Sequence, residues 1–179
     1  MAEFLWIFWS FSLLGWVLER LFAAVTRSPR RRRRCLLLLP LCPVYGLGMA
    51  AVLALPPSLR SGWPLYLWGG LTATSVEYIY HWWGETFLGV SFWDYTGVFG
   101  NFRGRVCLSF SLAWGLLLFP AVYLVTPPVV ALADRVPIGV TWWLLLAFTA
   151  DAVCSLRFLA VTHDLEALRA VIWPVSADR

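Results

Sequence analysis

Residues 106–125, VCLSFSLAWGLLLFPAVYLV, are twenty consecutive residues without a charged side chain. An apolar run of about 20 residues is long enough to cross a bilayer as a helix. Four other stretches are predominantly apolar over a similar length, and we expect spanning helices at residues 4–25, 35–55, 63–83, 106–125 and 139–160. The sequence therefore predicts an all-α, polytopic transmembrane bundle of about five spans in a single domain, residues 1–160, followed by a short tail at 161–179.

Composition agrees with a membrane protein. The chain is 60% hydrophobic and only 13% charged, whereas soluble domains carry about 25% charged residues. All fourteen basic residues are arginine. The absence of lysine excludes a Walker A phosphate loop and a lysine Schiff base, so we expect no ATPase activity of the chain's own and no cofactor.

Arginine placement predicts the orientation. With the run at residues 30–34 inside, eleven arginines flank inner helix ends and two flank outer ones. The positive-inside rule then places the N-terminus outside and the tail in the cytoplasm, in the cell (inner) membrane. Because topology accounts for the arginine run, we expect the lipid bilayer and not nucleic acid as its partner.

Three acidic residues interrupt the predicted spans at Glu19, Glu77 and Asp151. A charged side chain at the centre of a membrane helix costs about 2.5–3.5 kcal/mol on insertion scales. At 1.5 Å per residue, all three lie roughly 9–14 Å below the cytoplasmic surface. They could line a polar cavity open to the cytosol, or they could join helices by hydrogen bonds.

One face of the third span carries Glu77, His81 and Glu85, spaced by four residues. Carboxylate and imidazole groups at this spacing can bind a divalent cation or relay a proton. Alternatively, His81 only forms a hydrogen bond with a neighbour. The spacing leaves both interpretations open.

Residues 85–105 are rich in glycine and aromatic side chains. Such a segment is suited to the membrane interface, and irregular backbone at membrane depth is tolerated where it lines a cavity. We expect an interfacial or re-entrant cap over the acids, with an ordinary amphipathic connector as the alternative. Arg103 or Arg105 could pair with a buried carboxylate or hold a phosphate.

A short internal repeat links the two halves of the chain. The first acid-bearing helix is followed by Arg34-Cys35-Leu36 and then by Tyr45-Gly46, and the second by Arg105-Val106-Cys107-Leu108 and then by Trp114-Gly115. Duplicated hairpins are common in membrane transporters. A match this short also arises by chance.

Several blocks together resemble a known family. They are Gly15-Trp16-Val17-Leu18-Glu19, Pro40-Leu41-Cys42-Pro43-Val44-Tyr45-Gly46, Thr74-Ser75-Val76-Glu77-Tyr78, Glu85, Trp93-Asp94-Tyr95, Asn101, Gly104-Arg105 and Trp114-Gly115. In order and spacing they are similar to the CmpB-like type IV ABC-transporter permeases, small bacterial membrane proteins. The resemblance implies a permease of five or six helices. Leu39 departs from the family's usual glycine, and His81 stands where relatives commonly have a small residue, which argues against a family-wide histidine metal site.

Three functions are compatible with the sequence. The first is a permease-type transport component that works with a separate ATPase, and that could form a homo-oligomer. The second is an intramembrane enzyme acting on a lipid or isoprenoid, and the third is a structural accessory subunit. The candidate polar site comprises Glu19, Tyr45, Glu77, Glu85, Trp93, Asp94, Tyr95, Asn101, Arg103, Arg105 and Asp151.

Overall fold

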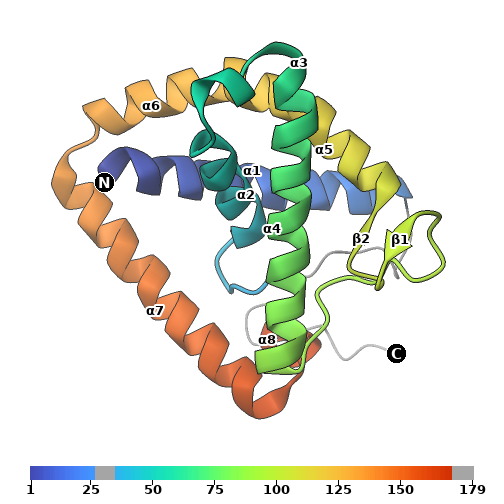
Figure 1. The fold of residues 1–179 in the computed structure, drawn as a ribbon. Helices are drawn as coiled ribbons and strands as arrows, with labels where there is room; N and C mark the ends of the chain where they lie inside the picture. Colours follow the sequence, from blue (N-terminus) through green and yellow to red (C-terminus); the bar gives the residue numbers. More distant parts are fainter. Residues whose placement is uncertain (27–34, 171–179) are drawn as a thin grey trace.

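The computed structural model describes residues 1–26 and 35–170, which are mostly helical (Figure 1). Helix α1 spans Ala2–Thr26, and α7 spans Ile138–Thr162. These two helices and the continuous helix Leu108–Arg135 are the three that are long and apolar enough to cross a membrane within the described residues. The helical membrane fold is thus confirmed in its coarse form, with three of the five expected spans.

The third expected span is longer than expected, and it is not among the three long apolar helices. It is one continuous helix built from α3 (Gly62–Pro64), the π-helical turn η3 (Leu65–Gly69), α4 (Gly70–Trp83) and a second π turn, η4 (Gly84–Leu88). A left-handed residue, Gly89 at φ 65°, ends it. The helix therefore continues five residues beyond the expected end at residue 83.

The expected helix at 35–55 is much shorter in the structure. Residues 35–42 are not helical, and α2 covers only Pro43–Leu53. Pro40 and Pro43 explain the difference, because each proline removes an amide donor and disfavours helical geometry in the residue before it. At 1.5 Å per residue α2 is only about 16 Å long, against about 30 Å of hydrocarbon core.

The fourth expected span does not end at residue 125 but continues through Pro127 and Pro128. Helix α5 (Leu108–Pro120) passes through the π turn η5 (Ala121–Val125) into α6 (Thr126–Arg135). Proline is tolerated in a first helical turn, where the missing amide would have no intrahelical partner. The Thr126 hydroxyl also donates to the Ala121 carbonyl at 2.8 Å. The expected outer loop is therefore largely helical.

The segment between η4 and α5 contains the one sheet among the described residues. Strands β1 (Asn101–Phe102) and β2 (Val106–Cys107) pair antiparallel, with Phe102 opposite Val106. Residues 103–105 connect them. Arg103 and Gly104 have φ values of 53° and 69°, and the Arg105 amide donates to the Phe102 carbonyl at 3.1 Å. Positive φ at both central residues is what a type I′ turn requires.

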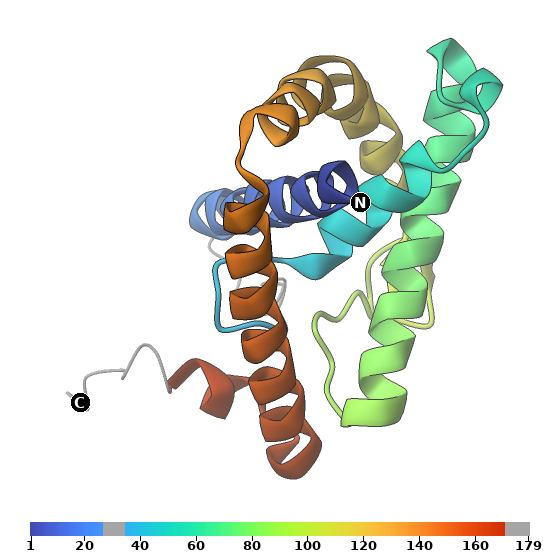
Figure 2. The same cartoon turned by 90° about the vertical axis from the view of Figure 1, so that its left-hand side faces the viewer.

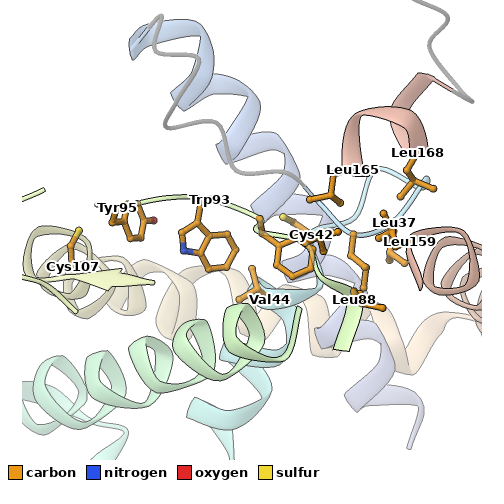
Figure 3. Packing of buried hydrophobic residues seen from close by; sticks show 13 residues of the cluster. Leu37, Cys42, Val44, Leu88, Trp93, Tyr95, Cys107, Leu159, Leu165 and Leu168 are labelled. Carbon is orange, nitrogen blue, oxygen red and sulfur yellow. The ribbon is translucent and has the colours of Figure 1, made fainter. Parts of the chain in front are cut away.

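Helix α2 lies between α7 and the helix of residues 62–88 in both views (Figures 1 and 2), and α1 crosses behind the helix of residues 62–88 in Figure 1. One buried cluster joins the segment before α2, the 89–107 segment, the end of α7 and helix α8 (Leu165–Ala170), as Figure 3 shows. The expected tail at 161–179 therefore begins with α7's last turn and α8. A second cluster joins α1, α2, η3 and α5.

Candidate functional site

Glu77 is the most deeply buried acid of the candidate set. It lies in the middle of α4 with only 1% of its surface exposed. The Trp114 indole N–H of α5 donates to Oε2 at 2.7 Å, and the Tyr95 hydroxyl donates to Oε1 at 3.2 Å. Hydrogen bonds to an ionised acceptor are stronger than those between neutral groups. Two other elements thus hold this carboxylate in place.

Glu19 has a matching arrangement on α1. The Tyr45 hydroxyl, from the first turns of α2, donates to Glu19 Oε1 at 2.5 Å. The Tyr45 ring packs edge-on against Trp114, with 5.1 Å between ring centroids. It approaches α1 at Gly15, where an added Cβ would clash with the ring. Gly15 therefore determines how closely Tyr45 can lie to α1.

Two cavities adjoin this pair of acids. The larger has a volume of about 350 Å³ and includes Glu77 in its lining, and the smaller has about 200 Å³ and includes Glu19. Tyr45 and Trp114 line both, together with two leucines, Leu18 and Leu117. The two carboxylates therefore border adjacent spaces that share an aromatic wall.

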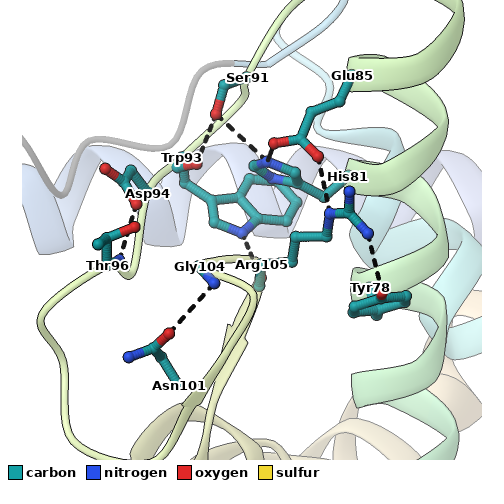
Figure 4. Close-up of polar contacts among 10 residues, drawn as sticks. All are labelled: Tyr78, His81, Glu85, Ser91, Trp93, Asp94, Thr96, Asn101, Gly104 and Arg105. Atoms are coloured by element: carbon teal, nitrogen blue, oxygen red, sulfur yellow. Dashed lines mark hydrogen bonds and ion pairs between the residues drawn. The ribbon is translucent and has the colours of Figure 1, made fainter.

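Arg105 organises a second polar cluster, at the end of α4 (Figure 4). Its Nε donates to Glu85 Oε2 at 2.7 Å, and its Nη1 donates to the Tyr78 hydroxyl at 2.8 Å. The Trp93 indole donates to the Arg105 carbonyl at 2.7 Å. Partial loss of water lowers the pKa of Arg105, but the bonds and charges of Glu85 and Tyr78 outweigh it, and the net pKa lies above its usual value. Arg105 stays positively charged throughout the neutral range.

His81 belongs to this second cluster. Its Nε2 lies 3.0 Å from Glu85 Oε1 and 3.3 Å from the Ser91 hydroxyl, and its ring packs against Trp93 (Figure 4). The bonds of Glu77 go instead to Tyr95 and Trp114. Across residues 1–26 and 35–170, no three His, Cys, Asp or Glu side chains group closely enough to hold a metal ion.

Three of the candidate residues shape the hairpin. Asp94 Oδ1 accepts the Thr96 amide at 2.8 Å, and Asn101 bonds the Gly104 amide and the Val98 carbonyl. Arg103 is exposed at the turn, with its guanidinium over the Phe102 ring. The bonds of Asp94 and Asn101 hold the backbone around Tyr95 and in the turn before Arg105.

Asp151 does not line either cavity. From α7 it accepts the backbone amides of Leu38 and Leu39 at 3.1 and 2.9 Å, and the Ser155 hydroxyl at 2.9 Å. It thereby binds the non-helical segment that leads into α2. The arginine run at 30–34 lies outside the described residues.

The candidate residues therefore do not form one site, and most of them belong to two separate groups. Glu19, Tyr45, Glu77 and Tyr95 adjoin the cavities, while Glu85, Trp93 and Arg105 form the second cluster. Sequence reasoning missed Trp114 and Tyr78 as polar partners. The Trp114-Gly115 pair in the internal repeat, which corresponds to Tyr45-Gly46, was the signal for the first.

A family model described as "Putative ABC-transporter type IV" matches residues 6–156. The chain belongs to this family. The resemblance seen in the sequence blocks is confirmed, and the match includes every residue that borders the two cavities. Comparison with curated proteins and with solved structures found no match. For this type IV ABC-transporter family member, the geometry around Glu19 and Glu77 is therefore the main guide to its chemistry.

Proposed function

We propose that the chain is a permease-type membrane component of a transporter and that Glu19 and Glu77 border its substrate site. The observation that carries the proposal is the position of both carboxylates in the walls of adjacent cavities between helices. Acidic side chains within spans commonly mark substrate or ion pathways. Family membership supports the transport class.

Asp151 provides an internal comparison with a purely structural acid. Its oxygens accept two backbone amides and a serine hydroxyl, and it lies apart from both cavities. Glu19 and Glu77 are instead held at cavity walls by aromatic donors from other elements. This contrast favours a binding role for these two over a role limited to joining helices.

Energy coupling would come from a separate chain. The sequence contains no lysine, which a Walker A loop requires, so an associated ATPase would bind and hydrolyse ATP. We further propose five spans in the inner membrane, with α2 and the helix of residues 62–88 completing the bundle. The arginine bias supports an outside N-terminus and a cytoplasmic C-terminus.

Comparing cells that express the chain with cells that lack it tests this function. Both strains grow in defined medium, and the cell-to-medium ratio of each metabolite is measured by mass spectrometry. We expect a compound class whose ratio changes with expression, and we expect Glu77→Gln to remove the change. Asp134→Asn, which removes an exposed carboxylate on α6, is the matched control and should keep it.

Membrane fractions must contain equal amounts of each variant, so that a folding failure is recognised. Unchanged metabolite ratios with well-expressed wild-type protein would contradict the transport proposal. Lipid extracts of the same cells separate the enzyme alternative, because a lipid that accumulates only without the chain would indicate intramembrane lipid chemistry instead.

A further inference from the structure

We propose that the larger cavity takes the alkyl chain of a lipid, which enters laterally from the bilayer. This inference deepens the proposed function, because it names a ligand class for the same site, and it rests on that function for the step from binding to transport. Three features carry it, namely the exposed residues on one side of the cavity, the buried residues on the other side and the open space beside Gly48.

The open side of the larger cavity belongs to two long apolar helices. Leu14, Leu18 and Leu21 of α1 line it, together with Leu117 of the helix Leu108–Arg135. These four leucines are between 39% and 60% exposed. Both helices are long and apolar enough to cross a membrane, so their exposed leucines face lipid tails, which are as apolar as leucine itself. The cavity is therefore continuous with the surface that the protein presents to lipid.

The opposite side of the cavity lies deep in the protein. Phe11, Val44, Met49 and Leu118 also line the space, and all four are buried. Phe11, Met49 and Leu118 belong to the second buried cluster of the fold. The space thus extends from the lipid-facing surface into the core, which a shallow furrow between two helices would not do.

Gly48 gives an independent indication of this open space. It is buried in α2 and lines the cavity, and a Cβ there would meet nothing within 4 Å beyond its own helix. A Cβ at Gly46, two residues earlier, would clash with the Phe8 carbonyl of α1. Helix α2 therefore packs closely on α1 at one glycine and leaves unfilled space at the other.

The chemistry of the lining favours an apolar chain. Among the described lining residues, all but Tyr45, Glu77 and Trp114 are glycine or have an apolar side chain, and each of these three takes part in a hydrogen bond within the protein. Apolar cavities exclude water and take up apolar molecules. An empty one would leave its walls without dispersion contacts. The volume of about 350 Å³ falls in the range of small-molecule sites.

Photolabelling of the full chain in lipid nanodiscs tests the inference. The probe is a phosphatidylglycerol with a diazirine near the middle of one acyl chain, and the same lipid with the diazirine in its headgroup is the control. Peptide mass spectrometry locates the label. We expect the chain probe, and not the headgroup probe, to label Val44 and Met49 on the buried side of the cavity. Label only at exposed residues such as Leu116 and Leu124 would indicate ordinary contact with surrounding lipid and would overturn the inference.

A substitution that fills the cavity provides the second test. Gly48→Leu adds a side chain where the space is open, and it should abolish the labelling of Val44 and Met49. Gly139→Leu is the matched control, because Gly139 is an exposed helical glycine of α7 whose Cβ also meets nothing within 4 Å, and it should keep the labelling. Equal labelling in the two variants would contradict the proposal.

Melting temperatures in nanodiscs show whether each variant is folded. If Gly48→Leu fails to fold, Ala73→Leu adds bulk to the same cavity from α4 and should likewise remove the label. A second copy of the chain is the other molecule that could cover the opening. Two chains per nanodisc by native mass spectrometry, with no label at Val44 and Met49, would indicate that copy and overturn the inference.

The outcome is separable from that of the proposed function. Acyl-chain labelling of Val44 and Met49 combined with unchanged metabolite ratios in cells would contradict transport and leave the lipid site standing. Transport of a compound without an alkyl chain that depends on Glu77, with no label at Val44 and Met49, would do the reverse.

Discussion

The ring centroids of Tyr45 and Trp114 lie 5.1 Å apart, and each residue donates a hydrogen bond to a different carboxylate. Tyr45 of α2 bonds Glu19 of α1, and Trp114 of α5 bonds Glu77 of α4. Each half of the chain therefore contributes one acid-bearing helix and one aromatic donor. The two donors meet at the wall between the cavities.

The glycine that follows each donor lies where two helices approach closely. A Cβ at Gly46 would clash with the Phe8 carbonyl of α1, and a Cβ at Gly115 would lie 2.8 Å from Tyr66 of η3. Small residues let membrane helices approach closely. The short repeat in the sequence thus corresponds to a shared structural unit, a close helix crossing next to an aromatic–carboxylate bond.

Replacing Trp114 by Phe should destabilise the bundle. The change keeps most of the ring but removes the donor at 2.7 Å from the buried Glu77. Hydrogen bonds within membrane proteins contribute about 0.6 kcal/mol on average and bonds to charged groups contribute more, so we expect a loss of about 1–2 kcal/mol. Reversible unfolding in mixed micelles measures the free energy of unfolding. Trp143→Phe, the same substitution at a 73% exposed position of α7, is the control, and an equal loss in both would contradict this role.

Replacing Gly15 by Ala should displace Tyr45. The added Cβ would clash with ring atoms near the Tyr45 backbone, which cannot move without shifting α2. Overpacking costs about 1–3 kcal/mol. Gly48→Ala is the matched control on α2, because a Cβ there meets nothing within 4 Å, and it should be neutral or slightly stabilising. Thermal unfolding measures the melting temperature of both variants, and equal melting temperatures would contradict this explanation.

Replacing Arg105 by Lys should loosen the hairpin. Lysine cannot reproduce a fork that bonds Glu85 and Tyr78 from two different nitrogens. We expect faster amide hydrogen exchange between residues 90 and 107 without global unfolding. Arg103→Lys, at the exposed turn position, should leave exchange unchanged. Equal exchange in Arg105→Lys and wild type would show that the guanidinium does not anchor this segment.

Replacing Asp151 by Asn should release the segment before α2. An amide side chain has one acceptor oxygen, whereas Asp151 uses both of its oxygens on the amides of Leu38 and Leu39. Cys42, now 3% exposed, should then react faster with a thiol reagent. Peptide mass spectrometry distinguishes it from the exposed Cys154, whose rate serves as the internal reference. An unchanged Cys42 rate would mean that other contacts hold the segment.

Sequence patterns predicted the helices at 4–25 and 139–160 well, because long apolar runs leave the backbone no alternative in lipid. They overestimated the helix at 35–55, since hydropathy does not register the amides that Pro40 and Pro43 lack. They ended the fourth span at residue 125, before Pro127 and Pro128, although a preceding π turn places these prolines in a new first turn. Local backbone geometry, rather than hydropathy, decided both differences.

Depth counting selected Glu19, Glu77 and Asp151 as a group, but depth along a helix does not give the direction of a side chain around it. Asp151 faces the segment before α2, and only the other two border the cavities. Partners separated by many residues, such as Trp114 for Glu77, depend on how helices cross. A single sequence contains little information on that crossing.

The contact between Asp151 and the amides of Leu38 and Leu39 spans 113 and 112 residues of chain. A ribosome makes α7 after every other helix except α8. The segment before α2 is thus synthesised well before its carboxylate partner. Its contact with Asp151 can form only after α7 has been made and has packed against it.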